Sequence, residues 1–230
     1  MPDFATIYAH YADAYDQLVS REDYQGNILK ALRRILSLQG IQVAEFGAGT
    51  GRVTRILAPW VRHVAAHDRS AHMLEYAKQR LRERSIDNVS LAIADNAAVP
   101  LASGVADLAI AGWSFGHATE WDAQRWRQVI GQGIAEMQRV LRPGGRAIII
   151  ETLGTGQDVP NPPSQVLSDY YAWLEHELHF QRTWIRTDYR FNSQEEADRL
   201  TGFFFGSPSP TILQSDQRVV VPECSGIWWR

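Results

Sequence analysis

A glycine-rich run at residues 47–51 and two later aspartates are the residues of this sequence best suited to binding a ligand. Glycine at positions 47, 49 and 51 removes Cβ atoms, so the backbone can adopt unusual φ values and approach a ligand closely. Asp68 can accept hydrogen bonds from both hydroxyls of a ribose, and Asp95 with Asn96 can bond an adenine amino group. Residue types and order therefore indicate a site for an adenosine-containing ligand.

The elements that must position these residues alternate between short apolar segments and helical patterns. Strands are predicted at residues 41–46, 61–66, 89–94, 106–111 and 147–151, and helices at 23–38, 52–60, 70–81 and 121–141. Continuous apolar strands alternating with helices indicate a doubly wound α/β fold, with a mostly parallel sheet covered on both faces. The marked residues all lie at the carboxyl end of one of the strands: residues 47–51, Asp68, Asp95, Trp113 and Glu151. Ligands of such folds bind at this edge of the sheet.

The pattern changes after residue 151. Residues 154–164 are predicted to form a long loop, residues 165–180 an aromatic-rich helix and residues 183–191 a strand. Ser193 followed by Glu196 fits a capping box that opens another helix. Residues 218–221 and 227–230 are expected to form a terminal antiparallel strand pair.

Composition and charge exclude several classes of protein. The 230 residues carry 23 Lys and Arg against 26 Asp and Glu, a net charge of −3, which argues against a nucleic-acid partner. A single cysteine, Cys224, excludes an internal disulfide framework and a cysteine-based zinc or redox site, and we predict no metal. Residues 1–20 lack the apolar stretch of a signal peptide, and no run suits a membrane span, so a cytoplasmic location is expected.

Two further residues bear on which nucleotide is bound. A nicotinamide dinucleotide fingerprint would need its third glycine at position 52, where Arg52 stands, and no Walker A sequence follows the run. Glu45 is an acid within an otherwise apolar strand. Because burying an unpaired carboxylate is costly, Glu45 is expected to have a cationic or hydrogen-bonding partner.

Several ordered motifs now resemble those of the class I S-adenosylmethionine-dependent methyltransferases, and most closely the type 11 group that includes ubiquinone/menaquinone-type enzymes. Residues 43–52, Val-Ala-Glu-Phe-Gly-Ala-Gly-Thr-Gly-Arg, are similar to the first motif of that family. His67-Asp68 resembles its ribose-binding acid, residues 94–97 its adenine-side motif, and residues 136–150 the approach to its fifth strand. The resemblance covers residues 25–152 and implies a seven-stranded Rossmann-like sheet with a C-terminal antiparallel strand pair.

The resemblance implies S-adenosylmethionine as the cofactor and assigns residues to it. The implied cofactor-binding residues are Glu45, Gly47, Ala48, Gly49, Gly51, Asp68, Arg69, Asp95, Asn96 and Trp113. The glycines would let the backbone pass the methionine part, whose amino group Glu45 would help to hold. Asp68 would bind the ribose, and Asp95 with Asn96 would face the adenine.

Candidates for the acceptor side are less specific. His117 could take a proton from the acceptor, or could simply hydrogen-bond a loop. Tyr8, Tyr11 and Tyr15 share one helical face, which related enzymes use to cover the acceptor and which could equally pack on the sheet. Tyr189 belongs to an alternating stretch that would either bind an acidic group of the substrate or face solvent.

We therefore expect one methyltransferase domain over residues 1–230, with a helical cap at 1–24 and residues 154–192 inserted over the acceptor pocket. The expected reaction is methyl transfer to an oxygen or nitrogen atom of a small molecule, and a homodimer is left open as the assembly. The alternatives are an inactive cofactor-binding regulatory or partner subunit, and an NAD-dependent oxidoreductase, which Arg52 disfavours. Tryptophans lie in the part that the resemblance does not explain, and an aromatic acceptor pocket is expected there: Trp173, Trp184, Trp228 and Trp229.

Overall fold

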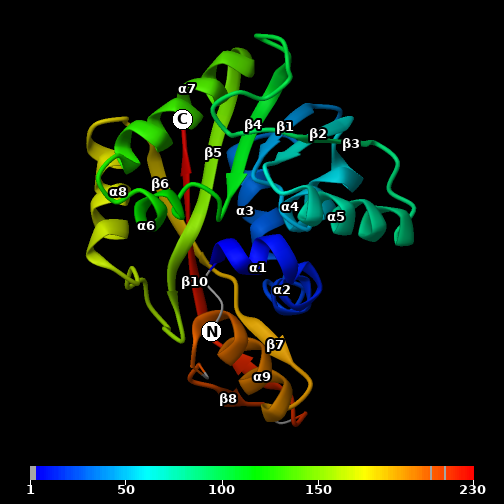
Figure 1. Cartoon of the computed structure of the whole chain (residues 1–230), viewed down its shortest axis with the longest axis vertical. Helices are drawn as coiled ribbons and strands as arrows, with labels where there is room; N and C mark the ends of the chain where they lie inside the picture. The colour runs from blue at the N-terminus through cyan, green and yellow to red at the C-terminus, as the bar shows by residue number, and fades with distance from the viewer. Residues whose placement is uncertain (1–3, 208, 215) are drawn as a thin grey trace.

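A seven-stranded sheet organises the protein, whose computed structural model describes residues 4–207, 209–214 and 216–230. Its strand order is β3-β2-β1-β4-β5-β10-β6 (Figure 1). The strands are β1 (Gln42–Phe46), β2 (His63–Asp68), β3 (Val89–Ile93), β4 (Ala106–Gly112), β5 (Leu141–Thr155), β6 (Gln181–Arg186) and β10 (Glu223–Trp229). Strands β1 to β5 pair in parallel, whereas β10 runs antiparallel between β5 and β6. The predicted fold, a doubly wound and mostly parallel seven-stranded sheet, is confirmed.

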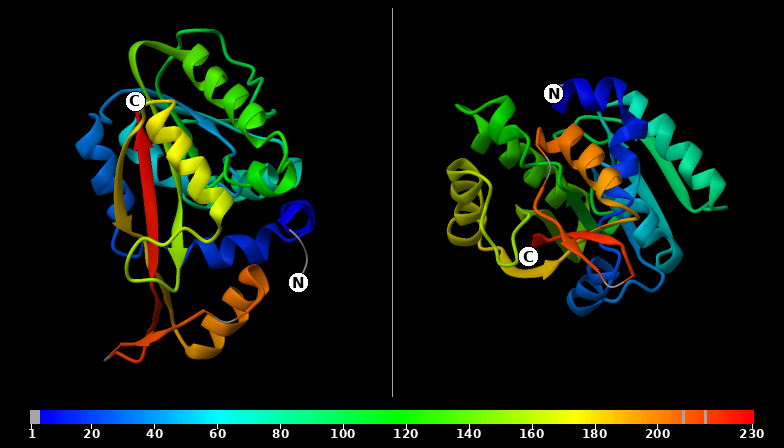
Figure 2. Two further views of the ribbon diagram at one scale, coloured as in Figure 1. Left: turned by 90° about the vertical axis from the view of Figure 1, so that its left-hand side faces the viewer. Right: turned by 90° about the horizontal axis from the view of Figure 1, so that it is seen from below.

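Helices connect the strands and cover both faces of the sheet (Figure 2). They are α1 (Phe4–His10), α2 (Ala12–Val19), α3 (Asn27–Ile35), α4 (Arg52–Leu57), the 3-10 turn η1 (Ala58–Trp60), α5 (Ala71–Glu83), α6 (Ala118–Trp121), α7 (Trp126–Val140), α8 (Gln165–His176) and α9 (Gln194–Phe205). Helix α5 begins at the predicted cap, because the Ser70 hydroxyl accepts a hydrogen bond from Met73 N. Likewise, Ser193 caps α9 by accepting from Glu196 N.

Alternation along the strands divides the apolar residues between two cores. Val43 packs with α3 and α4 on one face of the sheet, whereas the next residue, Ala44, packs with α7 and α8 on the other. The same alternation separates Ile148 from Ile149 in β5. Both faces are buried, which explains why these strands are apolar throughout.

The C-terminal part differs from the expectation in two ways. The stretch predicted as one strand at 183–191 divides into β6 and β7 (Tyr189–Phe191), which belong to different sheets. Residues 218–221 do not pair with 227–230: strand β9 (Val219–Val221) pairs with β7 and with β8 (Ile212–Leu213), whereas β10 pairs with β5 and β6. Pro222 separates β9 from β10, and it has no backbone N–H to continue a ladder.

A small unit therefore forms beyond the carboxyl edge of the large sheet. Strands β7 and β9 and helix α9 share an apolar core to which Leu18 of α2 contributes, and β8 pairs with β9 outside this core. Figure 1 shows α1 and α2 lying between this unit and the carboxyl ends of β1, β2 and β4. Segments from both termini thus meet at the edge where the sequence predicts the site.

Over the described residues, no helix has both the length and the apolar character needed to cross a bilayer.

Candidate active site

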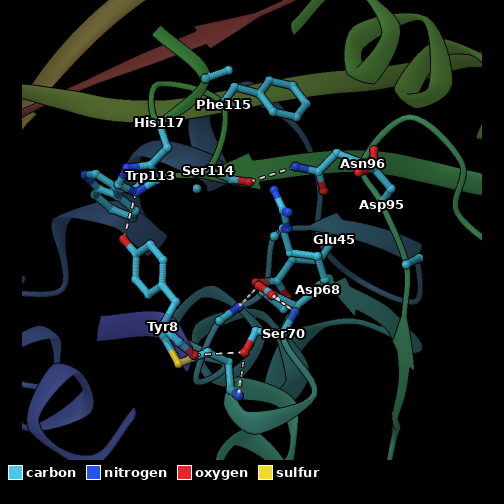
Figure 3. Close-up of a pocket in the computed structure, with 18 of the residues that line it drawn as sticks. Tyr8, Glu45, Asp68, Ser70, Asp95, Asn96, Trp113, Ser114, Phe115 and His117 are labelled. Atoms are coloured by element: carbon cyan, nitrogen blue, oxygen red, sulfur yellow. Dashed lines mark hydrogen bonds between the residues drawn. The ribbon is translucent and has the colours of Figure 1, made fainter. Parts of the chain in front are cut away.

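A cavity of about 700 Å³ lies at the carboxyl edge of β1, β2 and β4 (Figure 3). The predicted cofactor residues that line it are Glu45, Gly47, Ala48, Gly49, Asp68, Arg69, Asp95, Asn96 and Trp113. Gly51 does not line it. With a left-handed φ of +82°, Gly51 instead starts α4, close to the Ala77 side chain. The site is therefore built from residues at the ends of four neighbouring strands.

The turn after β1 requires glycine at two positions for separate reasons. Gly47 has a φ of +70°, and a Cβ atom there would collide with the side chain of Ser114. Gly49 has a φ of +55°, and its N–H donates to Asp68 Oδ2 at 2.8 Å. The turn thus brings backbone to the cavity wall and ties β1 to the end of β2.

Asp68 is held by backbone donors on both of its oxygens. Oδ1 accepts from Ser70 N at 2.8 Å, and Oδ2 accepts from Gly49 N. Burial raises the pKa of Asp68 above its ordinary value, and these two hydrogen bonds oppose that shift. The carboxylate is fixed in orientation, and each oxygen keeps capacity to accept from a ligand.

Glu45 is 2% exposed and has the hydrogen-bonding partner that its sequence context predicts. Thr54 Oγ1 donates to Glu45 Oε2 at 2.6 Å. Burial raises the pKa of Glu45 to about 7, although the Thr54 hydrogen bonds and the charge of Arg55 act in the opposite direction.

The segments after β3 and β4 meet across the cavity. Asn96 Nδ2 donates to Ser114 Oγ at 3.0 Å, which links the two segments, and Asp95 Oδ1 accepts from Ala97 N at 2.9 Å. Residues 113–117 were expected beside the cofactor, but Ser114 was not singled out among them. The glycine at position 47 was the available signal, since only a residue without a Cβ atom leaves room for this side chain.

A second cavity, of about 530 Å³, adjoins the first. The residues that line both cavities are Tyr8, Tyr15, Arg52, Trp113 and His117. In this shared wall the Tyr8 hydroxyl and His117 Nε2 are hydrogen-bonded at 2.7 Å (Figure 3). Burial lowers the pKa of His117 to about 4, so its imidazole is neutral at neutral pH.

Arg52 also belongs to the wall shared by the two cavities. In the sequence it stands where a nicotinamide dinucleotide fingerprint would have its third glycine. Its guanidinium carbon lies 3.5 Å from the centre of the Trp113 ring, and Nη1 pairs with Glu22 Oε2. Trp113 has a positive φ of 50°, which turns the chain out of β4 towards the cavities. Arg52 therefore braces the indole from the side of α4.

Three buried carboxylates line the second cavity, and the sequence marked only Glu151, as a strand-end acid. Glu151 Oε1 accepts from Gly116 N at 2.8 Å, and burial raises the pKa of Glu151 to about 8. Glu223 is 1% exposed, and its pKa is raised to about 8 by burial and by the nearby charge of Glu22. Glu223 could have been noticed as an acid within an apolar stretch, by the argument applied to Glu45.

The predicted acceptor-side tyrosines separate into two groups. Tyr8 and Tyr15 line both cavities, and Tyr189 lines the second. Tyr11 lines neither cavity: it is 45% exposed and its ring packs edge-on against Phe203.

The expectation that the C-terminal tryptophans form an aromatic acceptor pocket is not met. Trp173 and Trp228 are buried in the core on the α7–α8 face, and Trp184 is exposed. The rings of the second cavity come from tyrosine, phenylalanine, histidine and Trp113 instead.

Within residues 4–207, 209–214 and 216–230, no group of three or more His, Cys, Asp and Glu is arranged to hold a metal ion.

The sequence and the fold were compared with those of known proteins. Residues 43–145 match the family described as "Methyltransferase domain". This match supports a class I S-adenosylmethionine-dependent methyltransferase that uses S-adenosylmethionine as its cofactor.

Individual relatives are similar over part of their length. The protein is 32% identical to the uncharacterized protein YafE of Escherichia coli, over 49% of this chain and 50% of YafE. It is 30% identical to the malonyl-[acyl-carrier protein] O-methyltransferase of Pectobacterium atrosepticum, over 66% of this chain and 53% of that enzyme. The chain thus spans about half the length of these curated relatives. Among solved structures, a SAM-dependent methyltransferase from Aquifex aeolicus shares the fold, with a TM-score of 0.55 and 16% identity over 99% of this chain and 93% of that one.

Proposed function

We propose that this methyltransferase transfers the methyl group of S-adenosylmethionine to an oxygen or nitrogen atom of a small molecule. The observation that carries the proposal is the pair of adjoining cavities with a shared wall of Tyr8, Trp113 and His117. The first cavity is lined by the residues expected to bind adenosine, and the second has a volume that suits a small organic molecule.

The residues of the first cavity fit the cofactor chemically. We propose that the fixed carboxylate of Asp68 accepts the ribose hydroxyls and that Asp95 and Asn96 face the adenine. The open backbone at Gly47 and Gly49 is proposed to pass the methionine part, with Glu45 near its amino group. When bound, S-adenosylmethionine supplies an electrophilic methyl group on a sulfonium cation.

Residues of the shared wall are proposed to align the acceptor and exclude water. Trp113 lines both cavities and has the Arg52 guanidinium over its ring. Alignment with water exclusion is the main contribution expected for a transfer of this kind. His117 is proposed as the proton acceptor, because its imidazole is neutral and is oriented by the Tyr8 hydroxyl.

The two N-terminal helices and residues 154–192 are proposed to cover the acceptor. Supporting this, the second cavity is lined by Tyr8 and Tyr15 from the N-terminal helices, and by Gly154, Asn161 and Tyr189 from residues 154–192. The absence of a nucleic-acid partner, the cytoplasmic location and the homodimer remain predictions.

The proposal is tested by incubating the protein with S-adenosylmethionine and a library of small amines, alcohols and phenols. We expect S-adenosylhomocysteine to form together with a product heavier by one methyl group, as measured by mass spectrometry. Binding of the cofactor without turnover of any acceptor would favour the inactive regulatory or partner subunit.

His117→Ala is expected to lower kcat by about 100-fold or more if His117 accepts the proton, and near-wild-type turnover would remove it from the mechanism.

A further inference from the structure

The second cavity has an unusual excess of buried acid. Its buried carboxylates belong to Glu22, Glu151 and Glu223, which are 8%, 4% and 1% exposed. They come from the segment after α2, the end of β5 and the start of β10, so three distant parts of the chain converge here (Figure 1). Burying ionised carboxylates is costly unless a cation or several hydrogen bonds compensate them.

The protein itself supplies little compensation. Among the described residues that line this cavity, Arg52 is the only arginine or lysine, and it is paired with Glu22 Oε2 and stacked on Trp113. Glu151 and Glu223 receive hydrogen bonds from Gly116 N and from Thr152 Oγ1 but have no ion pair with a described residue.

Two carboxylate oxygens in this set lack a well-formed hydrogen bond. Glu22 Oε1 and Glu223 Oε2 are buried, and neither is hydrogen-bonded within the part of the chain that the structure describes. The side chains of Tyr189 and Thr187 lie close enough to Glu22 to lower its pKa, and that of Thr155 does the same for Glu223. Burial outweighs these contacts, and the pKa of each carboxyl group is raised. The charge of Glu22 contributes to the raised pKa of Glu223, which shows that the two groups act on each other. Each of these two oxygens can still accept a hydrogen bond from a ligand.

Aromatic rings line the remaining walls. Tyr15 packs against Phe204 with ring centres 5.6 Å apart, and Tyr189 packs edge-on against Phe205 at 6.3 Å. All four rings line the second cavity together with Tyr8 and Trp113. Carboxylates combined with aromatic faces form the usual chemistry of a site for an organic ammonium ion.

We infer that the second cavity binds an acceptor that carries a protonated amine, and that Glu22 and Glu223 hold this ammonium group. The inference rests on the proposed methyl transfer and narrows its substrate class to cationic small molecules. An ammonium ion has three donors and can bond both unpartnered oxygens at once, whereas a carboxylate ligand would be repelled and an alcohol has a single donor. The ammonium is proposed as the anchoring group, whichever atom of the molecule accepts the methyl group.

The test compares molecules that differ only in their polar group. Phenethylamine, phenethyl alcohol and hydrocinnamate form one matched set, and n-hexylamine, n-hexanol and n-hexanoate form another. Their affinities are measured by calorimetry on the full chain saturated with S-adenosylhomocysteine. We expect each amine to bind at least about tenfold more tightly than its alcohol, and the carboxylates not to bind.

Substitutions then assign the anchoring residues. Glu223→Gln and Glu22→Gln are each expected to weaken amine binding by about tenfold while the affinity for S-adenosylhomocysteine stays unchanged. Glu175→Gln is the matched control, because it removes the same charge from a carboxylate that pairs with Arg182 and lines neither cavity. Glu223→Gln removes the cost of ionising a buried carboxyl group, so above about pH 8 its melting temperature is expected to equal or exceed that of the wild type.

Equal binding of an amine and its alcohol, binding of a carboxylate, or no amine binding at all would contradict the inference. Amine affinity that is unchanged in both variants would contradict it as well. Failure of the proposed function gives a different result: S-adenosylhomocysteine would not bind, or no acceptor would gain a methyl group, whereas the preference for amines is read from binding alone.

Discussion

At the scale of single residues, the carboxyl groups at the edge of this sheet occupy two different environments. Asp68 is held on both oxygens by backbone N–H groups and has a fixed direction. Glu151 and Glu223 are buried, and because burial disfavours their ionised form, the pKa of each is raised to about 8. The first arrangement suits the recognition of neutral hydroxyls, and the second suits a ligand that brings a positive charge.

Replacing Asp68 by asparagine tests the first arrangement. The amide would keep the size of the side chain but lose one acceptor and the charge, and a hydrogen bond to a charged group contributes about 1.5–3 kcal/mol. We expect the Kd for S-adenosylhomocysteine to rise by roughly 10-fold to 100-fold in calorimetry. The exposed Asp87 provides the control, and Asp87→Asn should bind like the wild type. Unchanged affinity in Asp68→Asn would exclude Asp68 from ligand binding.

At the scale of elements, the start of α5 connects the cofactor cavity to the N-terminal helices. Ser70 Oγ accepts from Met73 N as the helix cap and donates to Tyr8 O at 2.9 Å. The same hydroxyl therefore stabilises α5 and ties α1 across the cavity.

Two cap substitutions separate these roles. Ser70→Ala and Ser164→Ala each remove an N-cap, the second from α8, where Ser164 accepts from Leu167 N. Each should lower stability by about 1 kcal/mol, a fall in melting temperature of roughly 2–4 °C. Of the two variants, only Ser70→Ala should also weaken S-adenosylhomocysteine binding, because Ser70 is hydrogen-bonded to Tyr8 and Ser164 does not line the cofactor cavity. Equal affinities in the two variants would show that this tether has no role in binding.

The elements also show how far sequence reasoning extends. Strands β1 to β5 and the turn at 47–51 could be predicted, because each is set by local periodicity and by glycine geometry. The division of 183–191 between two sheets could not, since it depends on Pro222 and on partners far along the chain. Glu22 was missed as a site residue for the same reason. Glu223 could have been noticed as an acid in an apolar stretch, but only the folded chain places it at the same cavity as Glu22.

At the scale of the whole molecule, the buried acids make folding stability depend on pH. A carboxyl group whose folded pKa is raised keeps its proton while the unfolded chain has already released it. The free energy of unfolding therefore falls as pH rises from the ordinary value of 4.5 to about 8 for Glu151, and the cost is complete above that range. Below about pH 4 the group contributes nothing to this dependence.

Glu151→Gln is expected to weaken this pH dependence. Across the range between about pH 5 and 8 the slope of unfolding free energy should become less negative by up to about 1.4 kcal/mol per pH unit, because one retained proton is removed from the folded state. Urea denaturation of the wild type and of Glu151→Gln at several pH values in that range measures the difference between their unfolding free energies. The contributions of all other titratable groups cancel in this difference. Parallel curves would show that Glu151 does not retain its proton on folding.

The central claim is that the cavity at the carboxyl edge of the sheet binds S-adenosylmethionine, and ligand-induced stabilisation tests it most directly. A ligand at about 100 times its Kd adds about 2.7 kcal/mol to the stability of the folded protein, a rise in melting temperature of roughly 5–10 °C for a chain of this size. We predict such a rise with S-adenosylmethionine and with S-adenosylhomocysteine. No rise with either ligand, together with no heat of binding in calorimetry, would contradict the claim.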